Sequence, residues 1–233
     1  MPHTAVILTG QMRSFATCIH TLRWHVLRHY PSPAFYVATV QDEDTASIKL
    51  LHELFPAAPV FTDIIDAQPE LPEPVEPVRF EPYARSVPMQ AVLRQLWQLE
   101  RGWELFQRHP VPATIFLRVR PDLFFHSFTP PAAVPARAAF TPWWGNFGGV
   151  NDRVAVLGAE AAPHYFTAYS HLAAAMQAGC PIHPESLVRA GLELRGARVI
   201  PRLITEFSTL RKNGEFRPPE IQAWDMAHAA LTG

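Results

Sequence analysis

Cysteine is scarce in this chain of 233 residues, and so are long apolar runs. Only Cys18 and Cys180 are present, and neither belongs to a Cys-x-x-Cys or a Cys/His pattern. A disulfide framework is therefore excluded, and both residues are expected to be small core side chains in a reducing compartment. Residues 1–10 hold a four-residue apolar run and no basic segment, which argues against a signal peptide.

The uncharged stretch of residues 161–184 is interrupted by three histidines and three prolines. This composition predicts a buried helix and not a membrane span, which needs about 20 predominantly apolar residues. We therefore expect a cytoplasmic protein without a transmembrane segment, either free or peripheral at the inner face of the membrane.

Neither sign of charge is in excess, because 20 Lys and Arg face 21 Asp and Glu, for a formal net charge of -1. This balance makes nucleic acid an unexpected partner. Lysine is nearly absent, since only Lys49 and Lys212 accompany 18 arginines. The bias reflects either genomic base composition or the use of arginine for forked contacts with phosphate or carboxylate.

Several catalytic motifs are also missing from the sequence. The chain has no GxSxG elbow, no GxxxxGK[ST] loop and no GxGxxG turn. The main sequence evidence for a serine hydrolase, a P-loop nucleotidase or a Rossmann dehydrogenase is therefore missing.

Proline, by contrast, is abundant, with 24 residues, or about 10% of the chain and roughly twice the usual share. In residues 67–88 it alternates with glutamate, which predicts an irregular loop with some polyproline II character. This loop is either a solvated connector or a lid or partner-binding segment. The chain length and 48% hydrophobic content predict one domain over residues 1–233.

Apolar runs and helical spacings alternate from the N-terminus onward, which predicts an α/β fold with a mostly parallel central sheet flanked by helices. Ser14 is the expected N-cap of the first helix, which begins at Phe15. Residues 199–200 are expected to form a last edge strand. The other expected strands are residues 5–8, 35–40, 60–65, 114–119 and 154–157, and the other expected helices are 45–55, 89–106, 159–177 and 185–195.

Arg118 and Arg120 lie on one side of the strand that ends at Val119, and Asp122 follows them. A guanidinium on a covered strand needs an anion, which is either a protein carboxylate or a ligand phosphate. Two arginines and one acid at the carboxyl end of a strand suit a diphosphate, because open α/β sheets bind ligands there.

Residues 143–152 are rich in aromatic side chains and glycine. Trp143 and Trp144 either form an aromatic surface on which a sugar ring could stack, or one belongs to the core while the other caps the sheet. Asp152 is either a turn residue or a contact to sugar or metal. Glu185, at the start of a predicted helix, is either a favourable partner of the helix dipole or a catalytic base.

Four motifs carry a family resemblance: TGQMR at 9–13, RVRPD at 118–122, NDRVAVLG at 151–158 and PE at 184–185. Together they resemble a family of small, soluble GT-A-like glycosyltransferases of surface-polysaccharide biosynthesis, over roughly residues 5–200. The resemblance implies a single GT-A-like, Rossmann-like domain. It also implies a nucleotide-diphospho-sugar donor bound across the carboxyl ends of the N-terminal strands.

By matched position, the first motif would lie near the nucleotide and the second where such enzymes carry an Asp-x-Asp metal motif. Arg120 replaces the first acid of that motif, so either Asp122 holds Mg²⁺ or Mn²⁺ alone, or the two arginines neutralise the diphosphate without metal. We expect a divalent metal at Asp122. The residues expected to bind the donor are Gly10, Gln11, Arg13, Arg118 and Arg120.

The resemblance implies transfer of a sugar to a glycan or lipid-linked acceptor, with Asp152 or Glu185 as the base. The alternative is a nucleotide-sugar or glycan-binding protein without turnover, which the missing acid favours. A metal-dependent phosphohydrolase would need more carboxylates around Asp122 than the local sequence supplies.

Overall fold

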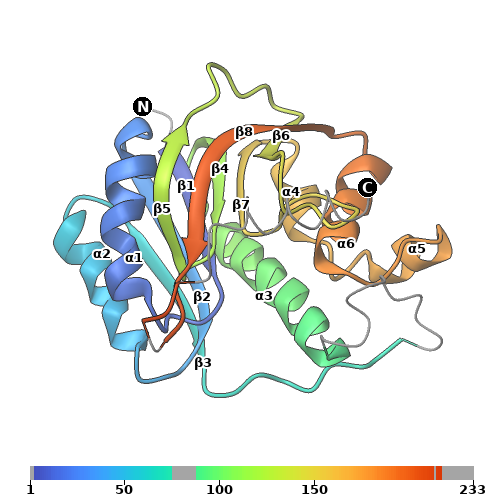
Figure 1. The fold of residues 1–233 in the computed structure, drawn as a ribbon, viewed down its shortest axis with the longest axis horizontal. Coiled ribbons are helices and arrows are strands. Elements are labelled where there is room, and N and C mark those ends of the chain that lie inside the picture. The colour runs from blue at the N-terminus through green and yellow to red at the C-terminus, as the bar shows by residue number, and fades with distance from the viewer. Residues whose placement is uncertain (1–2, 75–87, 213, 217–233) are drawn as a thin grey trace.

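The computed structural model describes residues 3–74, 88–212 and 214–216. Eight strands form one curled, mixed sheet in the order β3-β2-β1-β4-β7-β6-β8-β5, with helices on both faces (Figure 1). The structure is thus α/β, as expected. The part of the loop 67–88 that falls on residues 75–87 lies outside the described residues.

The N-terminal half of the sheet is parallel, as the sequence predicts. Each of the strands pairs in parallel with its neighbour in the order β3-β2-β1-β4. Alternate residues of β1 belong to different apolar clusters, because Ala5 and Ile7 face one layer of helices while Val6 and Leu8 face the other. These strands are β1 (His3–Thr9), β2 (Pro33–Val40), β3 (Val60–Ile65) and β4 (Ala113–Val119).

The other half corrects the expectation of a mostly parallel sheet. β7 runs antiparallel to both β4 and β6, and β5 runs antiparallel to β8, while β6 and β8 are parallel. The short segment 143–153 joins β6 to β7 without a crossover helix, so β7 must run back along the sheet. The strands are β5 (Leu123–Thr129), β6 (Ala138–Pro142), β7 (Val154–Gly158) and β8 (Arg198–Thr209).

Three strands differ from the prediction for residues 120–210. β5 was not expected, and β8 is a long strand between β6 and β5, not the short edge strand predicted at residues 199–200. A third difference is β6, which was not expected either. The sheet curls so that β5 reaches the first helix, where the Phe125 amide donates to Thr21 Oγ1 at 3.0 Å.

The helices form two layers. α1 and α2 cover one face of the sheet, and α3 with α4 and α6 covers the other (Figure 1). α1 continues through a π-turn, Leu22–Val26, and a 3₁₀ turn, Leu27–His29, and a 3₁₀ turn, Thr45–Ile48, precedes α2. The helices are α1 (Phe15–Thr21), α2 (Lys49–Leu54), α3 (Met89–Arg108), α4 (Ala162–Phe166), α5 (Leu172–Gln177) and α6 (Pro184–Leu194).

The single helix predicted for residues 159–177 is two short helices, α4 and α5. The break lies near Ser170, whose amide donates to the Glu100 carboxylate on α3 at 2.9 Å. A tertiary partner thus takes the amide that a continuous helix would use. Within the described part of the chain, no helix is long and apolar enough to cross a membrane.

Ser14 occupies the N-cap position of α1, as predicted, but its side chain does not cap the helix. Its hydroxyl donates instead to the Leu210 carbonyl at 2.8 Å, which ties the end of β8 to the start of α1. Next to it, the Leu210 amide donates to the Asp122 carbonyl at 2.9 Å. These contacts bring three distant segments to one edge of the sheet.

Candidate functional site

A pocket of about 240 Å³ opens at the edge of the sheet where β1 and β4 end. We call it the arginine pocket, because four arginines and one aspartate line it. Its volume is below the ~300–1,000 Å³ of typical small-molecule sites, so it fits the anionic part of a larger ligand. The lining residues are Thr9, Gly10, Gln11, Arg13, Gln68, Ala91, Arg94, Gln95, Gln98, Arg118, Arg120 and Asp122.

All the residues predicted to bind the donor or its metal are therefore brought together. Gly10 follows β1 with a φ of +133°, a conformation that favours glycine, and the backbone here lines the pocket. Gln11 is exposed, and the Arg13 Nη2 lies 3.4 Å from Asp122 Oδ2. The turn after the first strand thus supplies a guanidinium to the pocket, as the sequence predicts.

Arg120 and Asp122 form a forked ion pair across the turn at Pro121. Arg120 Nε donates to Asp122 Oδ1 at 3.0 Å, and Nη2 donates to Oδ2 at 2.7 Å. Burial by itself raises the pKa of Asp122, but the charge of Arg120, and then that of Arg13, outweighs burial and lowers the pKa. Asp122 is therefore an ionised, buried carboxylate held by two guanidinium groups.

Arg118 is held by backbone carbonyls, whereas the sequence suggested either a protein carboxylate or a ligand phosphate as its partner. It is 1% exposed, and its guanidinium donates at 3.1 Å to three backbone carbonyls, those of Thr9, Val119 and Asp152. Burial lowers the pKa of Arg118 to about 10. The side chain thus joins the ends of β1 and β4 to the start of β7, and it forms the floor of the arginine pocket.

The residues around Asp122 do not fit a divalent cation. Mg²⁺ and Mn²⁺ favour several oxygen ligands, whereas both oxygens of Asp122 accept from Arg120, and Arg13 adds a second positive charge. Within residues 3–74, 88–212 and 214–216, no group of three or more His, Cys, Asp or Glu side chains is placed to hold a metal ion. This geometry disagrees with the expected metal site at Asp122.

A second set of charges, which we call the acid cluster, adjoins the pocket and consists of Asp152, Arg153, His183 and Glu185. Glu185 Oε2 lies 2.8 Å from His183 Nδ1, and Oε1 lies 3.8 Å from Arg153 Nη2. Asp152 accepts a hydrogen bond from Gln95 of α3. Both predicted base candidates are therefore brought together, but neither lines the arginine pocket.

The electrostatics of the acid cluster differ from those of Asp122. Burial, and next the charge of Asp152, raise the pKa of Glu185, although His183 and Arg153 act in the opposite direction. The cluster also acts on the pocket, because Asp152 and Glu185 add to the effect of Asp122 in raising the pKa of Arg120 against the cost of burial. The two sets of charges are thus electrostatically coupled.

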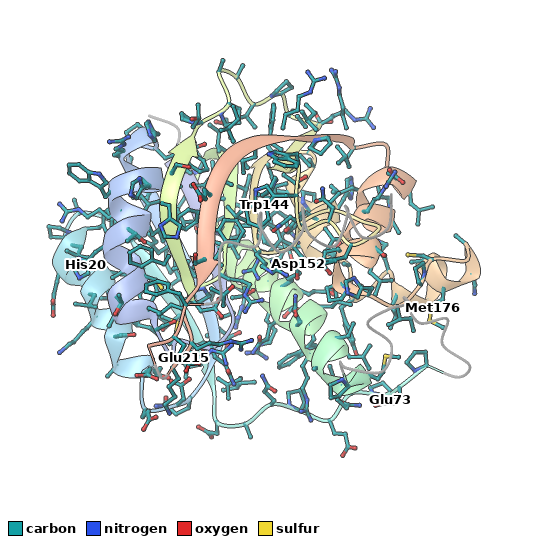
Figure 2. All side chains as sticks on the ribbon, in the orientation of Figure 1. His20, Glu73, Trp144, Asp152, Met176 and Glu215 are labelled. Atoms are coloured by element: carbon teal, nitrogen blue, oxygen red, sulfur yellow. The ribbon has the colours of Figure 1, made fainter. Side chains whose placement is uncertain are left out.

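The two adjacent tryptophans have separate roles. Trp144 is fully buried, its indole N–H donates to the Thr205 carbonyl at 3.1 Å, and it packs against Phe207. It is not available to stack on an acceptor sugar. Figure 2 shows it near the middle of the molecule, close in this view to Asp152. Trp143 is 46% exposed, so it is the tryptophan of this pair that solvent reaches.

Gly149 sets the distance between the 143–153 loop and α6. A Cβ at this position would lie 2.0 Å from the Glu185 carbonyl oxygen, and the adjacent Val150 amide donates to that oxygen at 3.0 Å. The close approach therefore requires glycine. It places Asp152, which follows in the same loop, beside Glu185.

Sequence reasoning missed the contribution of α3. Ala91, Arg94, Gln95 and Gln98 line the arginine pocket, at the i, i+3, i+4 and i+7 spacing of one helical face. The apolar face of this helix was expected, but its polar stripe was not interpreted. A signal was present in the sequence, because arginine and glutamine recur at that spacing beside the apolar positions.

No protein-family model matches the chain, and no curated protein matches it either. A proposal about the function therefore rests on the chemistry of the arginine pocket and the acid cluster.

Proposed function

We propose that this protein is a GT-A-like glycosyltransferase that moves a sugar from a nucleotide-diphospho-sugar to a glycan or lipid-linked acceptor. One observation carries the proposal: residues from all the motifs of the family resemblance meet at one sheet edge. TGQMR and RVRPD supply the arginine pocket, and NDRVAVLG and PE supply the acid cluster. A cytoplasmic location, free or at the inner face of the membrane, is part of the same proposal.

Binding of the donor rests on the arginine pocket. Arg13 and Arg120 have part-exposed side chains that pair with a common carboxylate, so they are oriented before a ligand arrives. Asp122 is then a positioning residue, which holds both guanidiniums at the pocket. The backbone at Gly10 lets a phosphate approach closely, because no side chain projects there.

Catalysis would come mainly from stabilising the departing diphosphate. Preorganised positive groups lower the barrier most where negative charge develops, which in sugar transfer is the leaving diphosphate. Arg13 and Arg120 lie where they would meet that charge, and Arg118 contributes charge from the floor. The bond from the anomeric carbon to the phosphate oxygen breaks, and a bond to the acceptor oxygen forms.

The acceptor hydroxyl must lose a proton, and Asp152 and Glu185 remain the candidate bases. The raised pKa of Glu185 makes that carboxylate the stronger proton acceptor once it is ionised. Asp152 lies closer to the pocket wall, through its contact with Gln95. Trp143 is the exposed aromatic side chain on the same loop, and we assign acceptor stacking to it.

The test is nucleotide release from a panel of nucleotide-sugars, with and without an added acceptor, in EDTA and in Mn²⁺. We expect release that Arg120→Gln abolishes, and that Arg189→Gln, on the exposed outer side of α6, leaves intact. Asp152→Asn and Glu185→Gln identify the base, because only the variant lacking it loses transfer while keeping donor affinity. Retained transfer in both variants would remove both residues from that role.

A binding protein without turnover is the second candidate. It is favoured by the burial of Asp152 and Glu185, whose side chains are 1% and 5% exposed. If the protein only binds, a nucleotide-sugar should bind, but no nucleotide should be released with any donor, with or without an acceptor or Mn²⁺.

A further inference from the structure

Two buried donors in the arginine pocket lack a partner. Arg13 Nε and Gln98 Nε2 have no hydrogen bond within residues 3–74, 88–212 and 214–216, although both atoms are shielded from solvent. An unsatisfied buried donor is costly, and native proteins leave few of them. Both residues line the same pocket, from the turn after β1 and from the middle of α3.

Gln98 is more than nine-tenths buried, in contrast to most glutamines on helix surfaces. Its neighbour on the stripe, Gln95, is already engaged with Asp152, and Arg94 Nε donates to the Pro69 carbonyl at 3.0 Å. Among the described residues, the stripe on α3 therefore has one buried donor without a hydrogen bond, and it belongs to the most buried side chain of the stripe.

The charge of the pocket indicates what kind of hydrogen-bond acceptor the two donors lack. Four arginines against one aspartate leave an excess of three positive charges among the lining residues. A cation at Asp122 would compete with Arg120, which already donates to both carboxylate oxygens. An oxygen-rich anion satisfies both unpartnered donors and the excess charge at once.

We infer that the arginine pocket binds a diphosphate without a divalent cation, and that Arg13 Nε and Gln98 Nε2 donate directly to its oxygens. This inference deepens the proposed function, because it concerns the same pocket. Gln98 is then a ligand-binding residue, and α3 forms one wall of the diphosphate site. The arginines replace the metal that an acidic motif would hold.

The test is calorimetric titration of the full chain with inorganic pyrophosphate in EDTA, repeated in Mn²⁺. We expect binding in EDTA that Mn²⁺ does not strengthen. Gln98→Met keeps the size of the side chain and removes the donor, so we expect about a tenfold loss of affinity. Gln107→Met, on the exposed end of the same helix, is the matched control and should leave affinity unchanged.

Thermal unfolding without ligand separates a ligand-binding role from a structural one. Because Gln98→Met removes an unpartnered buried donor, we expect the melting temperature to stay the same or rise while affinity falls. A lower melting temperature with unchanged affinity would overturn the role of Gln98. Gln98→Glu is the second variant, and it should lose more affinity than Gln98→Met because its carboxylate repels the diphosphate.

Two further outcomes distinguish this inference from the proposed function. Pyrophosphate binding that requires Mn²⁺, together with sugar transfer, overturns the inference and leaves the function standing. Pyrophosphate binding in EDTA, without sugar transfer under any condition, supports the inference and overturns the proposed function. Titration with uridine, guanosine and geranyl diphosphates then shows whether the diphosphate belongs to a nucleotide or to a lipid.

Discussion

The arginine pocket and the acid cluster lie at the same edge of the sheet, yet they handle charge in opposite ways. In the pocket, Arg13 and Arg120 surround one carboxylate and keep it ionised. In the acid cluster, two carboxylates are buried side by side, and the pKa of Glu185 rises because of burial and of Asp152. The first arrangement leaves an excess of positive charge at the pocket, whereas the second raises the pKa of a buried carboxyl group.

Access to solvent separates the two regions further. The side chains of Arg13 and Arg120 are 27% and 22% exposed, while those of Asp152 and Glu185 are 1% and 5% exposed. Both regions are nevertheless coupled, since the acid cluster raises the pKa of Arg120. The difference teaches that residue type alone does not identify a binding group, because exposure decides which charge a ligand meets.

The largest expected effect is on the ion pair of the arginine pocket. Arg120→Ala leaves the buried carboxylate of Asp122 without its forked partner, so we expect a loss of about 3–5 kcal/mol in the free energy of unfolding. Urea unfolding measures this loss. The control is Arg189→Ala, which breaks an exposed pair with Glu193 and should cost less than about 1 kcal/mol. Equal losses in the two variants would contradict the buried pair.

The acid cluster is expected to respond next most strongly, through the loop that carries Asp152. Gly149→Ala places a methyl group against the Glu185 backbone, so the loop must shift, at a cost of about 1–3 kcal/mol. The shift also separates Asp152 from Glu185, so the pKa of Glu185 should fall toward its ordinary value. Urea unfolding and the NMR titration of Glu185 measure the two effects. Gly179→Ala, where φ is +78° and a Cβ would meet no atom within 4 Å, adds backbone strain without a close contact, so it should leave the pKa of Glu185 unchanged.

Asp122 and Glu185 should give stability opposite dependences on pH. The folded protein lowers the pKa of Asp122, so the stability it contributes is present above the unfolded pKa and is lost as the pH falls through the folded pKa. The folded protein raises the pKa of Glu185, so stability is fully present below the unfolded pKa and is lost as the pH rises through the folded one.

Urea unfolding of the wild type, Asp122→Asn and Glu185→Gln between about pH 7 and about pH 3 checks this prediction. As the pH falls, the free energy of unfolding of the wild type should approach that of Asp122→Asn. Over the same range it should rise relative to that of Glu185→Gln. Two differences that move in the same direction would show that the regions do not differ in the way described.

The smallest effect on stability is expected at Arg13. Its pair with Asp122 is 3.4 Å long and partly exposed, so Arg13→Gln should cost less than about 1 kcal/mol. Pyrophosphate affinity should nevertheless fall about tenfold, because a donor and a charge are lost from the pocket. Arg137→Gln, which breaks an exposed pair with Glu160, is the control and should change neither quantity appreciably. A change in stability without a change in affinity would contradict a ligand-binding Arg13.

Much of the fold could be predicted from local pattern. The strands at residues 60–65 and 114–119 and the long helix from Met89 were expected within a few residues, because apolar periodicity is a local property. β5 was missed, since Pro121 and Asp122 indicate a strand end and give no sign that a strand follows. The break between α4 and α5 was missed because the partner of Ser170, Glu100, lies 70 residues away.

The candidate site was predictable in location but not in its contacts. The sequence indicated that the residues predicted to bind the donor gather at the carboxyl ends of the N-terminal strands, because parallel strands end at one edge. It could not indicate that Trp144 is buried under β8, or that Ser14 bonds to Leu210 across 196 residues. It also could not indicate that Gln98 lines the pocket, since that depends on how α3 lies across the sheet.

The sequence by itself determined which residue types stand near the strand ends, because spacing along the chain sets the face and the end of each element. Only the tertiary structure decided what each charge does. Arg118 and Arg120 are two residues apart, the first within β4 and the second just after it, yet backbone carbonyls hold the first and Asp122 holds the second. The partner of a buried charge depends on which atoms the rest of the fold brings within hydrogen-bond distance. The local sequence pattern does not indicate those atoms, because they come from distant parts of the chain.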